Sequence, residues 1–214
     1  GAERCFRGSL QRLAVPAIHG LRVHDAEEEE RFEAATASWG AVAHLVHLRE
    51  TDQIQEVSVS ANDAGYMLRL LRAFPEGTID CVLMAGCWNL MNRSAREVFL
   101  ECERLDIRVH NAGVFASGVL AGGDNYKYAS ASPEILAARD KWETLAAGYG
   151  LPLKAVAVGF GGLPRVVEKV VLGMGSSAEV KENMEMVKLS DIPSQLWDDA
   201  VRENLLDVWD VPTP

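Results

Sequence analysis

The chain alternates short apolar runs with longer segments in which apolar residues recur at helical spacing. Each run has the length of a buried strand, and each longer segment places its apolar side chains on one helical face. Repeated strand–helix units are therefore predicted, with strands over residues 17–23, 54–59, 81–85, 107–112 and 168–172. Helices are predicted over residues 28–48, 63–74, 94–105, 132–149, 153–160, 176–189 and 192–206, and the tail over residues 211–214 is expected to be loose.

Three details of this pattern make sharper predictions. The helix over residues 28–48 is expected to bury one face, which carries Phe32, Trp39 and Val42 among others. Ser176 stands three residues before Glu179, the spacing of a capping box, and this predicts a helix start. Residues 113–131 contain four glycines and no helical pattern, so they are expected to form a long loop.

Repeated units of this kind predict an α/β fold with a parallel sheet covered by helices, in one domain over residues 1–214. Two architectures compete. An open doubly wound sheet would be complete with the five predicted strands, whereas a closed eight-stranded barrel would need three more. In both, side chains that bind ligands gather where strands end and helices begin.

Composition narrows the function classes. The formal net charge is -10, from 31 acidic and 21 basic residues, which argues against nucleic acid as a partner. No apolar run reaches the ~18 residues of a membrane helix, and the first residues do not have the pattern of a signal peptide. Four cysteines without a C-x-x-C pair are expected to be buried reduced thiols, which suits a cytoplasmic location. No metal site is predicted, since His44 and His47 share a helix face without a third ligand nearby.

Polar side chains at the predicted strand ends are the candidate functional residues. His24 could donate a hydrogen bond to a substrate oxygen, or simply be a rim histidine. Asn62, after Ser60, could bind an amide or cap the next helix. Phe115 could stack on a flat ring, and the amides after Ser117 could meet a phosphate.

The last strand end spells G-x-G-x-x-A, beginning at Gly173. This spacing resembles a dinucleotide fingerprint, but that fingerprint belongs to the first strand–helix turn of an open sheet, and here only helix follows. A barrel is favoured instead, because its phosphate site commonly uses the loops after the last two strands and a helix N-terminus.

The order of these segments resembles the aldo-keto reductase family, and most closely its aldose and sugar dehydrogenase branch. The resemblance rests on L-R-V-H-D, S-V-S-A-N-D, V-F-A-S-G-V-L-A-G-G and V-L-G-M-G-S-S-A-E-V-K-E-N, and it extends over residues 9–206. It implies a (β/α)8 TIM barrel of which this chain supplies about strands 4–8. It also implies hydride transfer between NAD or NADP and an aldose sugar or other carbonyl or alcohol, a small-molecule substrate.

The resemblance also implies roles for individual residues. His24 matches the family's active-site histidine, Ser60 and Asn62 the group that holds the nicotinamide carboxamide, and Phe115 the aromatic stacked on that ring. Ser117, Gly118 and Leu120 match the pyrophosphate-binding segment. The segment for the adenosine end is matched by Gly173, Gly175, Ser176, Glu182 and Asn183.

The sequence departs from the family's pattern at two points. Glu179 stands near the position where NADP-preferring members have an arginine, which slightly favours NAD. The family's Tyr, Asp and Lys come from its first three strands, and no part of this chain matches them. An inactive, truncated relative that binds nucleotide or has a structural role is therefore the alternative. The expected partner is the small-molecule substrate, without nucleic acid or membrane, for a monomer or weak homo-oligomer.

Overall fold

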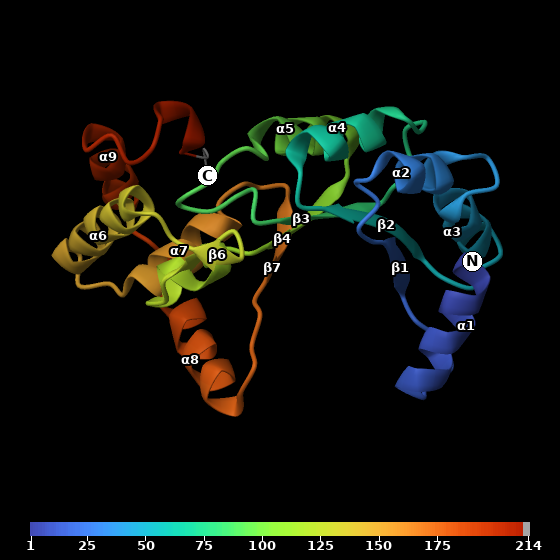
Figure 1. Cartoon of the computed structure of the whole chain (residues 1–214), viewed down its shortest axis with the longest axis horizontal. Helices are drawn as coiled ribbons and strands as arrows, with labels where there is room; N and C mark the ends of the chain where they lie inside the picture. Colours follow the sequence, from blue (N-terminus) through green and yellow to red (C-terminus); the bar gives the residue numbers. More distant parts are fainter. Residues whose placement is uncertain (212–214) are drawn as a thin grey trace. The chain divides into compact units, whose positions relative to one another are not determined.

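The computed structural model describes residues 1–211, which divide into two compact units (Figure 1). The first consists of Gly1–Met84 and Glu97–Val109, and the second of Ala85–Arg96 and the chain from His110 onwards. Strands and helices alternate along the chain, so the protein has an α/β fold. The predicted tail lies outside the described residues except for Val211.

The first unit is a parallel sheet with helices packed on it. Its elements are α1 (Ala2–Leu13), β1 (Gly20–Val23), α2 (Glu29–Thr36), α3 (Ala41–Glu50), β2 (Glu56–Ala61), α4 (Ala64–Arg72), β3 (Cys81–Ala85), α5 (Arg96–Leu105) and the start of β4 (Arg108–Ala112). In the parallel register, Val23 lies opposite Val59 and Ala61 opposite Met84. Figure 1 shows α4 and α5 together on one side of β2 and β3. All of the strands predicted for this unit are confirmed, with shifts of a few residues at their ends.

Strand β2 lies between β1 and β3, and every one of its residues is buried. Its buried residues are not all apolar, because Glu56 and Ser58 are among them. Both find partners. Arg108 donates to Glu56 at 2.7 Å, and Arg22 donates to the Ser58 hydroxyl at 2.7 Å. Buried polar groups are tolerated when they are hydrogen-bonded in this way.

The single helix predicted over residues 28–48 is wrong. The structure has α2 and α3 instead, separated at Gly40, and Trp39 is 81% exposed rather than buried. A Cβ on Gly40 would lie 2.4 Å from the carbonyl oxygen of Ala34, so only glycine permits this close approach of the backbone. The helical spacing of apolar residues continues across the break, and for this reason the pattern alone did not reveal it.

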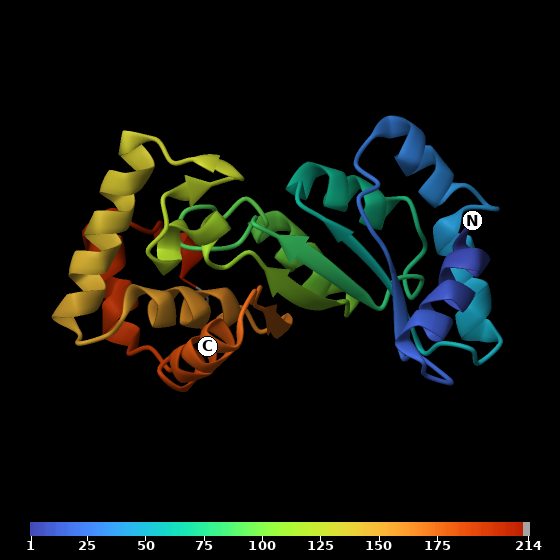
Figure 2. The same ribbon diagram turned by 60° about the horizontal axis from the view of Figure 1, so that its bottom comes forward.

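The second unit contains the end of β4, which lies beside β7. Its further elements are η1 (Ala116–Ala121), β5 (Asn125–Tyr126), β6 (Ala129–Ser130), α6 (Pro133–Gly148), α7 (Leu153–Gly162), β7 (Val167–Val171), α8 (Ser177–Lys188), α9 (Ser194–Arg202) and η2 (Val208–Asp210). Residues 113–131 are thus not one structureless loop, because they form η1 and an antiparallel hairpin of β5 and β6. The hairpin lies against η1, as Figure 2 shows in yellow-green.

An aromatic cluster forms the core of the second unit. Phe160 on α7 is fully buried and stacks on Trp88, with ring centroids 5.2 Å apart. Its other neighbour is Trp197 on α9, at 5.8 Å. Asn111 on β4 donates to the carbonyl oxygens of Trp88 and Gly161, which fixes the strand end against α7. This cluster holds β4 and α7 in place, and the turn after β4 and the start of α7 line the cavity described below.

Exposure at the edge of the sheet differs from the prediction. Strand β7 was expected to be apolar and buried, but none of its five residues is buried. It is the last strand of the sheet order, so one side of it has no neighbouring strand among the described residues.

The cysteines agree with the prediction only in part. Cys81, Cys87 and Cys102 are buried free thiols, but Cys5 is exposed. Within residues 1–211, no helix combines the length and apolar character needed to span a bilayer.

Candidate functional site

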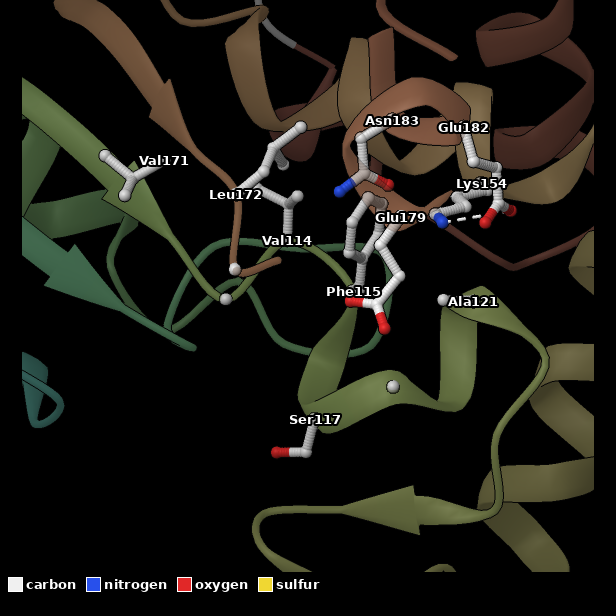
Figure 3. A pocket seen from close by; sticks show the side chains of 13 residues that line it. Val114, Phe115, Ser117, Ala121, Lys154, Val171, Leu172, Glu179, Glu182 and Asn183 are labelled. Atoms are coloured by element: carbon white, nitrogen blue, oxygen red, sulfur yellow. Dashed lines mark ion pairs between the residues drawn. The ribbon is translucent and has the colours of Figure 1, made fainter. Parts of the chain in front are cut away.

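A cavity of about 470 Å³ lies in the second unit. Segments far apart in the sequence line it: the turn after β4, the η1 segment, the start of α7, the end of β7 and the first two turns of α8. Figure 3 shows the side chains around it, with Phe115, Asn183, Glu179 and Lys154 close together. A cavity of this size at strand ends is the usual place for a small-molecule ligand.

The η1 segment has an unusual backbone. Ala116, Ser117 and Gly118 have φ values of 49°, 61° and 105°, so two non-glycine residues adopt the left-handed conformation. Such conformations cost about 1 kcal/mol or more each, and they concentrate at ligand sites. The carbonyl oxygen of Phe115 accepts hydrogen bonds from the amides of Gly118 and Leu120, at 2.9 and 3.2 Å. This compact turn presents Phe115, Ser117 and Gly118 to the cavity, whereas Leu120 is buried and does not line it.

The predicted capping box at the start of α8 is confirmed in part. The Ser176 hydroxyl accepts a hydrogen bond from the amide of Glu179 at 3.2 Å, as an N-cap should. The Glu179 carboxylate accepts from the amide of Gly175 at 2.8 Å, one residue before the position that the capping box predicts. Glu179 also lines the cavity, so a negative charge stands at the N-terminus of this helix. Gly173 lines the cavity, but Gly175 and Ser176 support it only through Glu179.

Three further side chains complete the cavity wall. Asn183 is 2% exposed, and its carboxamide oxygen has no hydrogen-bond partner. Lys154, at the start of α7, forms an ion pair with Glu182 of α8 at 3.0 Å. The Lys154 ammonium also lies 5.2 Å from the centroid of the Phe115 ring, within reach of a cation–π interaction. A buried amide oxygen without a partner costs about 1–3 kcal/mol, so Asn183 is suited to accept a hydrogen bond from a ligand.

The remaining predicted site residues lie in the first unit. His24 directly follows β1, and its side chain is 67% exposed and paired with Asp25 at 2.8 Å. Ser60 is buried at the end of β2, where its hydroxyl donates to the carbonyl oxygen of Val23 at 3.4 Å. The structure therefore places His24 in an accessible position, while Ser60 joins the ends of β1 and β2.

The suggestion that Asn62 caps α4 is wrong. The N-cap is Asp63, whose carboxylate accepts from the amide of Tyr66 at 2.6 Å. The backbone amide of Asn62 donates to Glu27 at 3.0 Å, and the Asn62 residue is exposed after the end of β2. Burial, with a smaller contribution from Glu27, raises the pKa of Tyr66 to about 12. A phenol with a raised pKa is a poorer proton donor, and the Tyr66 hydroxyl is buried without a hydrogen-bond partner.

A comparison with models of known protein families identifies the family of this chain. The model of the aldo/keto reductase family matches residues 1–201. The chain belongs to the aldo/keto reductase family. It is 29% identical over 218 residues to the pyridoxal 4-dehydrogenase of Microbacterium luteolum, a match that covers 96% of this chain and 62% of that enzyme. It is 28% identical over 222 residues to the D-threo-aldose 1-dehydrogenase of a Pseudomonas species, covering 100% of this chain and 63% of that enzyme. The chain thus spans less than two thirds of the length of both relatives.

Solved aldo-keto reductases share its fold. The holo form of the aldo-keto reductase from Bacillus halodurans superposes with a TM-score of 0.73 at 18% identity, over 96% of this chain and 67% of that one. The glycerol dehydrogenase of Gluconobacter oxydans gives a TM-score of 0.68 at 19% identity, over 99% of this chain and 65% of that one.

Some of the residues that line the cavity were not predicted from the sequence. Lys154 was not among the candidate residues, although a single basic residue in an otherwise apolar helix was a usable signal. Val171 and Leu172 also line the cavity and were assigned only to a buried strand. Within the described residues, no group of three or more His, Cys, Asp or Glu side chains is arranged to hold a metal ion.

Proposed function

We propose that the protein containing this chain is an NAD(P)-dependent oxidoreductase, which acts on an aldose sugar or another carbonyl or alcohol substrate. We further propose that the cavity of the second unit binds the nucleotide. Membership of the aldo/keto reductase family and the dehydrogenase relatives support the reaction class. The observation that carries the binding proposal is Asn183, which lines the cavity and whose buried carboxamide oxygen has no hydrogen-bond partner.

The cavity residues fit such a cofactor. Phe115 lines the cavity with a partly exposed side chain whose ring could stack on a flat heterocycle, and Asn183 can accept from an amino group of a base. Ser117 and Gly118 approach the cavity through backbone that carries no bulky side chain. When bound, the nicotinamide cofactor supplies the acceptor or donor of hydride. We assign Phe115, Ser117, Gly118, Gly173, Glu182 and Asn183 to the walls of its site, with Leu120, Gly175 and Ser176 supporting them.

The strand ends of the first unit have complementary roles in this proposal. His24, accessible after β1, donates a hydrogen bond that orients the substrate oxygen. For Ser60 and Asn62, at the end of β2, binding of the cofactor's carboxamide is the role that the family resemblance implies, and it stays a prediction. The group that moves the proton is expected from the part of the barrel that this chain does not include. We accordingly propose that the chain supplies about strands 4–8 of an eight-stranded barrel. β1 and β7 are the outermost strands of the sheet order, which supports this proposal.

A titration with NADH by fluorescence tests the binding proposal. We expect the full-length protein to bind NADH, and the substitution Asn183→Leu to weaken that binding about tenfold by removing one buried hydrogen bond. Nicotinamide mononucleotide lacks the adenosine end, so its affinity should be equal in the two proteins. If the full-length protein binds neither NADH nor NADPH, the proposed function is wrong.

A second candidate is a relative that binds nucleotide without catalysis. Its support is that no part of the chain matches the family's Tyr, Asp and Lys. Turnover of aldoses and of pyridoxal by the full-length protein separates the two candidates, since an inactive relative would bind NADH but show no substrate-dependent change in its absorbance.

Cofactor preference gives a further prediction. The Glu179 carboxylate lines the cavity at the start of α8, where it would repel the additional phosphate of NADP. We expect Glu179→Gln to improve NADPH affinity about tenfold relative to NADH, because glutamine can still accept from Gly175 but has no charge. Direct titration with each cofactor measures the ratio. The control is Glu185→Gln, which removes an exposed charge paired with Lys188 on the same helix. An unchanged ratio in Glu179→Gln would show that this carboxylate does not select the cofactor.

A further inference from the structure

Lys154 is an unusual residue for its position. It lies near the start of α7, a helix whose other residues are apolar or glycine, and its side chain is only 12% exposed. Lysine is seldom so deeply buried, because the ammonium group loses solvation and the long side chain loses conformational freedom. Its partner Glu182 is 55% exposed, and ion pairs with such exposed carboxylates contribute little to stability. The contact between α7 and α8 therefore gives little reason for a lysine here.

The charged groups around the cavity determine which of them could hold an anionic ligand. Among the residues that line it, the charged ones are Lys154, Glu179 and Glu182, so Lys154 is the one cationic side chain in this lining. An anionic ligand would meet two carboxylates and would need this ammonium group to offset them. The amides of Gly118 and Leu120 already donate to Phe115, so they are engaged within the η1 segment. An ammonium group has three donors, and Glu182 occupies one of them.

The position of Lys154 indicates which part of the ligand its ammonium group would contact. Its ammonium lies 5.2 Å from the Phe115 ring and 3.0 Å from Glu182, which immediately precedes Asn183 (Figure 3). In the proposed function, Phe115 stacks on one end of the dinucleotide and Asn183 binds the other. The diphosphate joins these two ends, and it carries the negative charge.

We propose that Lys154 is a binding residue for the diphosphate of the dinucleotide, with Glu182 as the counter-ion that holds its ammonium group beside the cavity. This inference rests on the proposed function. Two N–H groups of the ammonium are directed to phosphate oxygens once the ligand is bound, as charge-assisted hydrogen bonds. Phe115 contributes through its ring face, which stabilises the cation before and after binding.

The test is a set of calorimetric titrations of the full-length protein with adenosine, ADP and NADH. Lys154→Met should weaken the binding of ADP and NADH about tenfold or more, because a charge-assisted hydrogen bond to phosphate is lost. Adenosine, which has no phosphate, should bind equally to both proteins. The salt dependence of ADP affinity should also decrease in the variant. Lys188→Met is the matched control, since Lys188 is exposed and pairs with Glu185 outside the cavity; all of its affinities should stay unchanged.

A second variant separates binding from a purely structural role. Glu182→Gln keeps Lys154 and removes the competing carboxylate, so ADP should bind at least as tightly as in the unmodified protein. If the ion pair were only structural, Lys154→Met and Glu182→Gln would lower the melting temperature alike and weaken adenosine as much as ADP, which would overturn the inference. Lys154→Gln provides the same comparison if the methionine variant does not fold. Equal ADP affinities in the Lys154 variants and the unmodified protein would also overturn it and leave the proposed function standing. A protein that binds neither ADP nor NADH would instead contradict the proposed function.

Discussion

Replacement of His24 by alanine is expected to lower the turnover number about 100-fold or more, with little change in cofactor affinity. A side chain that donates to the reacting oxygen acts mainly in the transition state, and losses of this size are typical for such groups. The His24 side chain is 67% exposed after β1, so its removal should not disturb the core. Steady-state kinetics with an aldose substrate, together with the dissociation constant for NADH, measure both effects.

The control for this substitution is His47→Ala, since His47 is an exposed histidine on α3. We expect its turnover number to equal that of the unmodified protein. Equal losses of turnover and of NADH affinity in His24→Ala would contradict the proposed role, because they would indicate a residue that holds the cofactor or the fold.

The largest effect on stability is expected from Phe160→Ala. Phe160 is fully buried between Trp88 and Trp197, with ring centroids 5.2 and 5.8 Å away. The substitution removes the aromatic ring and leaves a cavity that the surrounding side chains fill only in part. The free energy of unfolding should fall by about 3–5 kcal/mol. Chemical denaturation followed by tryptophan fluorescence measures it, since both neighbouring rings report directly on the cluster.

Val187→Ala is the matched control in the same unit. Val187 on α8 is 44% exposed, so its truncation removes little buried surface, and we expect a change within about 0.5 kcal/mol. If Phe160→Ala unfolded at the same denaturant concentration as this control, the aromatic cluster would not be the core of the second unit.

Local sequence patterns were sufficient to predict much of the fold. The strands β1, β2, β3, β4 and β7 lie where apolar runs predicted them, because the strands of a parallel sheet usually carry such a run in the chain itself, although β7 is not buried. The start of α8 was also predictable, since the cap formed by Ser176 is a contact within a few residues. The break at Gly40 was not, because it depends on the close approach of one backbone segment to the carbonyl oxygen of Ala34.

The residues of the candidate site also fall into two groups, those that the sequence predicted and those that it did not. Phe115, Gly173 and Asn183 were identified from the sequence, since each lies in a motif that resembles the family and the first two also lie soon after a strand end. Lys154 was missed, because its meaning depends on Glu182 from another helix and on the Phe115 ring. No spacing within α7 encodes these two contacts.

The sequence by itself determined the alternation of strands and helices, the family, and the order of the candidate residues along the chain. These properties depend on short-range periodicity and on residue types, which are written directly in the chain. Only the tertiary structure decided which side chains meet. It brought the η1 turn, α7 and α8 around one cavity, engaged the amides of Gly118 and Leu120 internally, and left the carboxamide oxygen of Asn183 without a partner. The physical reason is that burial, ion pairing and unsatisfied hydrogen bonds arise between segments distant in sequence, and only packing brings those segments together.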